Sequence, residues 1–125
     1  MISCSLPSTE RLKSLTAVRR LFADGETGFV YPFRYIVYTE KSTSPSVEVL
    51  FSVPNRYHKR ANRRNLLRRR TKEAYRLQKS GLHEALAGKG VAMDIAFVYS
   101  AKEVLPYKTI SYAVRRILQE VAERS

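Results

Sequence analysis

One stretch of this chain, residues 56–79, carries most of its net charge. It holds eleven lysine and arginine residues against a single acid, Glu73, whereas the rest of the chain has twelve basic and ten acidic residues. The whole chain has a formal net charge of +12. Positive charge concentrated in one stretch, instead of spread over the surface, is typical of a face that binds a polyanion. The sequence therefore favours nucleic acid as a partner.

Length and composition limit the fold. A chain of 125 residues is enough for one domain with one hydrophobic core, so we expect residues 1–125 to form a single domain. Its 44% hydrophobic content argues against a disordered basic tail. The single cysteine, Cys4, excludes an intrachain disulfide and suits a reducing, cytoplasmic setting. No signal-peptide pattern opens the chain and no apolar stretch approaches the roughly 20 residues that span a bilayer, so no membrane partner is expected.

The spacing of apolar residues predicts alternating helices and strands. We expect a helix over residues 9–23, strands over 29–40 and 47–53 joined by a hairpin loop, a helix over 60–79, a short turn of helix over 83–88, a strand over 91–100 and a helix from about residue 106. The last helix should carry its apolar residues on one stripe: Ile110, Ala113, Val114, Ile117, Leu118 and Val121. The first two strands should be antiparallel, Gly81 should end the long helix, and the run 91–100 should be buried on both faces. The order α-β-β-α-β-α predicts an α+β fold, a mixed α/β sandwich with helices covering a small sheet.

The basic segment has two faces when it is projected as a helix at 100° per residue. Its apolar side holds Leu66, Leu67, Ala74 and Leu77. The other side holds a row of Arg64, Arg68 and Lys72, flanked by Asn65, Arg69 and Arg76. Like charges at i and i+4 destabilise a helix by roughly 0.2–0.5 kcal/mol per pair, whereas a merely solvated face would mix signs. The row therefore favours a polyanion partner, with Arg64 and Arg68 projecting into solvent. Arg70 is expected to lay its stem over the core edge and to carry its head group to water.

Arginine outnumbers lysine by eight to three in residues 56–79. A guanidinium group makes forked contacts to phosphate oxygens and stacks on bases, which an ammonium group does not. Asn65 adds both a donor and an acceptor for a base edge or a 2′-hydroxyl. This choice of residues favours nucleic acid over a general attraction to negative surfaces.

The run SVPNRYHKRANRRNLLRRRTKEAYRL, residues 52–77, resembles the signature of the bacterial ribonuclease P protein subunit. In that family a strand ending in Ser-Val is followed by basic residues and then by R-N-x-x-K/R-R-x-x-R/K-E-A on a helix. The matching positions are Ser52, Val53, Arg56, Arg64, Asn65, Arg68, Arg69, Lys72, Glu73 and Ala74. Residues 11–25 and 34–40 are similar to the family's first helix and first strand. The fold that the resemblance implies is the ribosomal protein S5 domain 2-like α+β arrangement, here as a single RNA-binding domain.

The resemblance also implies a function. The implied function is that of a subunit of a ribonucleoprotein endonuclease, which removes the 5′ leader of precursor tRNA. The RNA subunit of this enzyme would hold the catalytic Mg²⁺ ions. The protein would bind that RNA and the leader, with no catalytic or metal-binding residue of its own and no obligate protein partner. The protein alone should then be inactive. The residues agree, because Asp94, His58 and His83 are isolated in the sequence and do not form a cluster for two metals; Asp94 is expected to be structural and the histidines to lie at the surface.

Two contact surfaces follow from the resemblance. The catalytic RNA would be bound by Arg56, Lys59, Arg60, Arg64, Asn65, Arg68, Arg69 and Lys72. The single-stranded leader would lie in a cleft between the sheet and the first helix, beside Lys13, Phe22, Phe29, Tyr38, Phe51 and Ser52. Aromatic rings beside cations suit single strands, since stacking contributes roughly 1–3 kcal/mol per base. Packing in the core remains the alternative for Phe22, and core packing is favoured for Phe51.

Two other classes of protein remain open on composition. A ribosomal or other structural RNA-binding protein would share the charge and size but would not promote cleavage of precursor tRNA. A DNA-binding module with residues 60–79 as its recognition helix is less favoured, because a uniformly basic helix carries few side chains for reading base edges.

Overall fold

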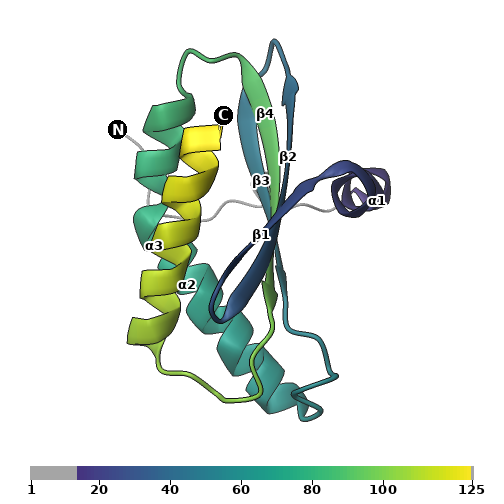
Figure 1. Cartoon of the computed structure of the whole chain (residues 1–125), viewed down its shortest axis with the longest axis vertical. Coiled ribbons are helices and arrows are strands. Elements are labelled where there is room, and N and C mark those ends of the chain that lie inside the picture. The colour runs from purple at the N-terminus through teal and green to yellow at the C-terminus, as the bar shows by residue number, and fades with distance from the viewer. Residues whose placement is uncertain (1–13, 125) are drawn as a thin grey trace.

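The structure, a computed structural model, describes residues 14–124. Its elements are α1 (Leu15–Asp24), β1 (Glu26–Val30), β2 (Phe33–Lys41), β3 (Ser46–Ser52), α2 (Ala61–Leu86), β4 (Val91–Tyr99) and α3 (Tyr107–Arg124). The helices α2 and α3 lie side by side on one face of the sheet, and α1 lies against the other face (Figure 1). This arrangement confirms the predicted α+β class, with one strand more than expected. Within the described part of the chain, no helix combines the length and apolar character that crossing a membrane requires.

The four strands form one sheet in the order β1-β2-β4-β3. β2 pairs with β1 and with β4 in antiparallel fashion, and β4 pairs with β3 in parallel. β4 is thus a central strand with helices on both sides, and seven of its nine residues are buried. The prediction that the apolar run 91–100 is buried on both faces is confirmed.

Two predictions about the strands are wrong. The expected strand 29–40 is divided at Pro32, because proline has no N–H for the ladder and the chain turns there, so that β1 and β2 form a hairpin. The expected hairpin between residues 29–40 and 47–53 does not form. Those strands do run in opposite directions, but β4 lies between them and pairs with both. Alternation of apolar residues identifies a strand but not its neighbour.

The long helix does not end at Gly81 as predicted. α2 continues to Leu86 and absorbs the short helical turn expected over residues 83–88. The buried residues Leu82 and Leu86 extend its apolar face past the glycine, and their burial outweighs the cost of about 1 kcal/mol that a glycine imposes inside a helix. Leu77, expected on the apolar side, is half exposed.

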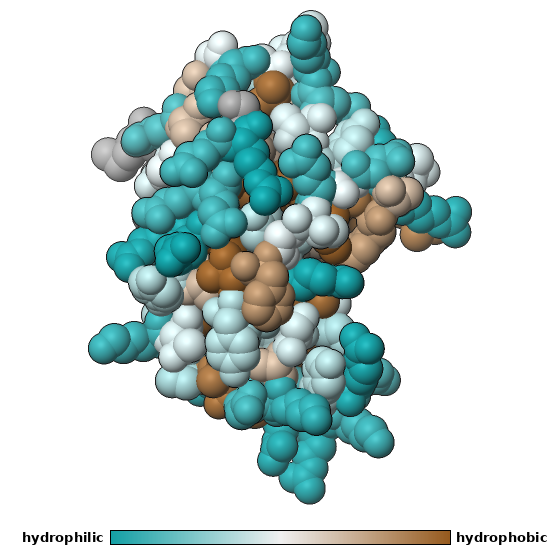
Figure 2. Space-filling model, viewed as in Figure 1, coloured by the Kyte–Doolittle hydropathy of each residue, from teal (hydrophilic) through white to brown (hydrophobic). Residues whose placement is uncertain are grey.

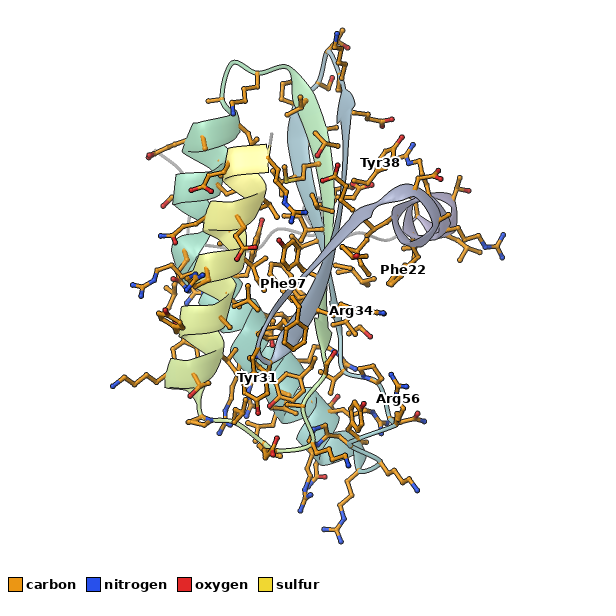
Figure 3. The ribbon with its side chains drawn as sticks, viewed as in Figure 1. Phe22, Tyr31, Arg34, Tyr38, Arg56 and Phe97 are labelled. Atoms are coloured by element: carbon orange, nitrogen blue, oxygen red, sulfur yellow. The ribbon has the colours of Figure 1, made fainter. Side chains whose placement is uncertain are left out.

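The alternation of side chains along the strands divides the core into two clusters. Phe33, Tyr35 and Phe97 belong to the larger cluster between the sheet and α2 and α3. Ile36 and Ala96 belong to a smaller cluster, which α1 covers with Leu21 and with the partly buried Ala17 and Val18. Figure 3 shows this separation, with Phe97 on the side of α3 and both Phe22 and Tyr38 on the side of α1. The predicted apolar stripe of the last helix is confirmed, since all of its members are buried: Ile110, Ala113, Val114, Ile117, Leu118 and Val121.

Two glycines provide opposite tests of this packing. A Cβ at Gly28 would overlap the ring of buried Tyr35, whose hydroxyl donates to Glu120 Oε1 at 2.8 Å. Gly28→Ala should therefore lower the free energy of unfolding by about 1–3 kcal/mol. A Cβ at Gly81 meets nothing within 4 Å, so Gly81→Ala should raise it by about 0.5–1 kcal/mol. Denaturant unfolding measures both, and a Gly28→Ala variant as stable as the parent would contradict the pairing of β1 with β2.

Candidate nucleic-acid interface

The predicted RNA-binding residues lie together at the start of α2 and in the loop before it. They occupy consecutive turns at one end of the molecule, where hydrophilic side chains project in Figure 2 and where Figure 3 labels Arg56. All of them are exposed or half-buried. We name this set the basic ridge: Arg56, Lys59, Arg60, Arg64, Asn65, Arg68, Arg69 and Lys72.

Neutral oxygens, not carboxylates, accept the hydrogen bonds of two ridge side chains, Arg64 and Arg68. Arg64 Nη1 donates to the carbonyl oxygens of His58 at 3.0 Å and Lys59 at 2.7 Å. Arg68 Nη1 donates to Asn65 Oδ1 at 3.1 Å. Among residues 14–124, no cation of the ridge forms an ion pair with a carboxylate, and the salt bridges that do occur involve Arg20, Arg76 and Arg124. The ridge therefore keeps its positive charge for an outside partner.

The backbone at the start of α2 adds to this charge. The N-cap residue, Arg60, makes no capping hydrogen bond with its side chain, and the first turn contains no acid. The first N–H groups of a helix have no partner within the helix, and the helix dipole places partial positive charge there. Such a terminus surrounded by arginines is suited to bind a phosphate group.

A latch fixes the loop that precedes α2. His58 is 2% exposed, its Nε2 lies 2.8 Å from the carbonyl oxygen of Ala101, and its ring meets Tyr99 edge-on at 5.6 Å. Because a carbonyl oxygen only accepts, Nε2 must carry the proton. The contacts of Arg64 with His58 and Lys59 tie the same loop to the helix. We call His58 and Arg64 the loop latch.

Hydrogen bonds to main-chain carbonyl groups correct three expectations. His58 is buried and not at the surface. Arg64 does not simply project into solvent, because it is half-buried against the loop. Arg70 does not carry its head group to water but donates from Nη1 to the carbonyl oxygen of Leu105 at 2.6 Å. In each case the partner is a main-chain carbonyl, which a side-chain pattern does not reveal.

A second surface lies on the face of the sheet that α1 covers in part. Phe22 on α1 is 47% exposed and Phe29 on β1 is 60% exposed. Ser52 lies on this same face, because its register partner on β4 is Val98, a member of the smaller core cluster. Arg34 is exposed here beside Phe29, its partner in the β1–β2 pairing. We name this set the α1-side face: Phe22, Phe29, Arg34, Tyr38 and Ser52.

Sequence reasoning missed Arg34. Its alternation with Ile36 and Tyr38 along one strand would have placed it on the same side of the sheet as the predicted aromatic residues. Figure 3 shows Arg34 on the α1 side of the ribbon, between Phe22 above and Arg56 below. A cation thus connects the aromatic residues of the α1-side face to the basic ridge.

The structure does not bring Phe51 to this face. Its ring stacks on Phe97 with a centroid distance of 5.7 Å and meets Tyr75 edge-on at 5.9 Å. Both partners belong to the larger core cluster on the opposite side of the sheet, because successive residues of a strand point to opposite faces. Lys13, the remaining predicted leader contact, lies outside the described residues.

Tyr38 is already engaged within the protein. The guanidinium carbon of Arg20 lies 4.7 Å from the centre of its ring, and Arg20 Nη2 lies 3.5 Å from oxygens of both Glu40 and Asp94. One side of the Tyr38 ring is therefore covered. This leaves Phe22 and Phe29 as the open aromatic side chains of the α1-side face.

Asp94 has the structural role predicted for it. It is 6% exposed, and β3 places Glu48 directly beside it in register. Burial raises the pKa of Asp94, although the Arg20 guanidinium acts to lower it. Burial, and then the negative charge of Asp94, raises the pKa of Glu48. Two acids with raised pKa values thus lie under α1. Among residues 14–124, no group of three or more His, Cys, Asp or Glu side chains is arranged to hold a metal ion.

The raised pKa of Asp94 predicts how stability changes with pH. The folded protein holds this proton more tightly than the unfolded chain does, so acidification from neutral pH toward the ordinary carboxyl range adds stability through Asp94, and that contribution is lost as the pH rises through the raised pKa. Asp94→Asn removes this linkage. The stability of the wild type relative to Asp94→Asn should therefore increase as the pH falls from about 7 to about 4, the ordinary pKa of an aspartate. Thermal unfolding across that range measures the difference, and a constant difference would contradict the pKa direction.

Comparison with known proteins agrees with this geometry. The model of the family described as Ribonuclease P matches residues 6–122. The chain is similar to the ribonuclease P protein component of Porphyromonas gingivalis, with 31% identity over 94% of this chain and 86% of that protein. It is also similar to that of Chlorobaculum tepidum, with 36% identity over 78% and 69% of the two chains.

Solved structures show the same fold at low identity. The ribonuclease P protein of Staphylococcus aureus has a TM-score of 0.69 and 17% identity, with 95% of this chain and 93% of that chain covered. The protein from Thermotoga maritima has a TM-score of 0.65 and 22% identity, with 89% and 96% covered. With the family model matching most of its length, this chain belongs to the ribonuclease P protein family.

Proposed function

We propose that this protein is the RNA-binding subunit of a ribonuclease P holoenzyme, which removes the 5′ leader of precursor tRNA while the RNA subunit holds the Mg²⁺ ions and makes the cut. The observation that carries the proposal is the basic ridge, a row of cations that the described carboxylates leave unpaired. Like charges at i and i+4 in this row repel one another and lower the stability of the free protein. A bound polyanion would remove this repulsion.

The ridge would bind the folded catalytic RNA through its phosphates. Arg60 and Arg69 are exposed and their guanidinium groups suit forked contacts to phosphate oxygens. At the N-terminus of α2, where Arg60 makes no side-chain capping bond, the N–H groups of Ala61 and Asn62 are offered to a phosphate at the same end. The loop latch would keep Lys59 and Arg60 in place before the RNA arrives, so that less conformational entropy is lost on binding.

The α1-side face would hold the single-stranded leader. Phe22 and Phe29 supply exposed rings for stacking, and Arg34 supplies charge beside them. Stacking does not depend on the identity of the base, which suits a segment that differs from one precursor to another. Arg34 of this face lies between Phe22 and Arg56 of the ridge (Figure 3), so one RNA assembly could contact both surfaces.

The protein's own acid–base groups support a non-catalytic role for it. Asp94 is buried beside Arg20, and His58 is buried with Nε2 bonded to a carbonyl oxygen. Neither side chain has access to a substrate, which a general base requires. We therefore propose that the protein positions RNA and that the RNA supplies the chemistry.

A reconstitution tests the proposed function. The purified protein is mixed with a bacterial ribonuclease P RNA and a precursor tRNA at low Mg²⁺ concentration, where RNA-only cleavage is slow. We expect cleavage at the mature 5′ end to be stimulated and the protein alone to cleave nothing. An absence of stimulation would contradict the proposal and would favour a structural RNA-binding protein instead.

The ridge itself is tested by a matched pair of charge-neutralising variants. Arg69→Gln removes an exposed charge from the ridge, and Lys41→Gln removes an exposed charge at the far end of β2. A plot of log affinity for the ribonuclease P RNA against log salt should become shallower by roughly 0.7–0.9 for Arg69→Gln, the loss of one phosphate contact. It should stay unchanged for Lys41→Gln. Equal slopes for both variants would show that Arg69 does not contact RNA.

A further inference from the structure

A third surface lies on the outer side of the helix pair, away from the sheet. Two adjoining hollows of ≈ 280 and ≈ 350 Å³ run between α2 and α3 and share Gln78 and Arg115 in their walls. Gln78 on α2 bonds to α3 there, since its Nε2 donates to the carbonyl and hydroxyl oxygens of Ser111 at 3.1 and 3.2 Å. We call these two hollows the outer groove. Its floor is held by hydrogen bonds between the two helices and is thus formed in advance of any partner.

Tyr112 stands at the wall of the outer groove with 52% of its surface exposed. Arg116 Nη1 donates to its hydroxyl at 3.3 Å, and the guanidinium carbon of Arg115 lies 5.4 Å from the centre of its ring. Unlike Tyr38, which is half-buried under Arg20, Tyr112 remains exposed beside its two guanidinium groups. It does offer a stacking surface flanked by positive charge.

The charge of the outer groove indicates which class of ligand it suits. Its walls include the cations Lys108 and Arg115 and contain no Asp or Glu. A strand of nucleic acid combines flat apolar bases with a negative backbone, and open aromatic rings beside cations bind such strands by stacking and charge together. An apolar peptide could fill the two hollows, but it would bring no negative charge to pair with Lys108 and Arg115.

We propose that the outer groove binds a single-stranded segment of RNA, with Tyr112 as the stacking ring and Lys108 and Arg115 as the phosphate contacts. The inference rests on the proposed function, because it assumes an RNA assembly around the protein. It adds a contact separate from the basic ridge and from the α1-side face. The ridge is formed by the loop before α2 and by the turns of α2 up to Lys72, whereas the outer groove involves later turns, from Gln78 to Leu82, together with α3.

Crosslinking from position 112 tests the inference. A photoreactive benzoyl-phenylalanine replaces Tyr112 in the full chain, and in a control chain it replaces Thr43, an exposed residue of the loop between β2 and β3. Each protein is assembled with ribonuclease P RNA, with and without precursor tRNA, and irradiated. A crosslink from position 112 to either RNA, identified by labelling each in turn, is expected, with none from position 43. A crosslink to a second protein copy, or none from position 112, would overturn the inference.

Affinity gives a second measurement. Tyr112→Ala should weaken binding to the ribonuclease P RNA by about tenfold, within the range for one stacked base, whereas Tyr112→Phe keeps the ring and should bind nearly as the wild type does. Equal affinity of Tyr112→Ala and wild type would overturn the inference while leaving the proposed function intact. Failure of the wild type to bind the RNA would overturn both. Circular dichroism confirms folding, which an exposed substitution should preserve.

Discussion

Hydrogen bonds from arginine to neutral oxygens are the interaction on which this structure depends. Arg64 binds the carbonyl oxygens of His58 and Lys59, Arg68 binds the amide oxygen of Asn65, and Arg70 binds the carbonyl oxygen of Leu105. Carboxylates would hold the same side chains more strongly, but they would also neutralise them. Because the partners are neutral, the side chains are ordered and the charge remains available to a phosphate backbone.

The same interactions join the core to the surface that would contact RNA. The strand β3 ends at Ser52, and the loop latch fixes the following loop against Ala101 and the start of α2. The packing of Phe51 and Tyr75 against Phe97 holds β3 and α2 to the central strand from the other side. The first turns of α2 are thus rigidly placed relative to the sheet, and with them the ridge relative to the α1-side face. A ribonucleoprotein that must place a substrate strand beside a catalytic RNA needs this fixed geometry.

Much of this arrangement is predictable from the sequence, and the exceptions have physical reasons. The apolar stripe from Ile110 to Val121 and the burial of β4 follow from periodicity, and the exposed charge of Arg60 and Arg69 follows from composition. The pairing of β4 between β2 and β3 was not predictable, because alternation carries no information about neighbours. The division of the expected strand at Pro32 was not predictable, because a proline in such a run fits an edge strand, a bulge or the start of a strand equally well. The roles of His58 and Arg64 depend on main-chain carbonyls that come close only in the folded chain. Phe51 could be placed only once the register of β3 was known.

A structure of the protein bound to ribonuclease P RNA and precursor tRNA is the most direct measurement. RNA phosphate oxygens should lie about 2.7–2.9 Å from the guanidinium nitrogens of Arg60 or Arg69, with the scissile bond at Mg²⁺ ions held by the RNA. The contacts of Arg64 with His58 and Lys59 should be unchanged from the free protein. A complex in which the first turns of α2 face solvent, or in which protein side chains surround the scissile bond, would contradict this prediction.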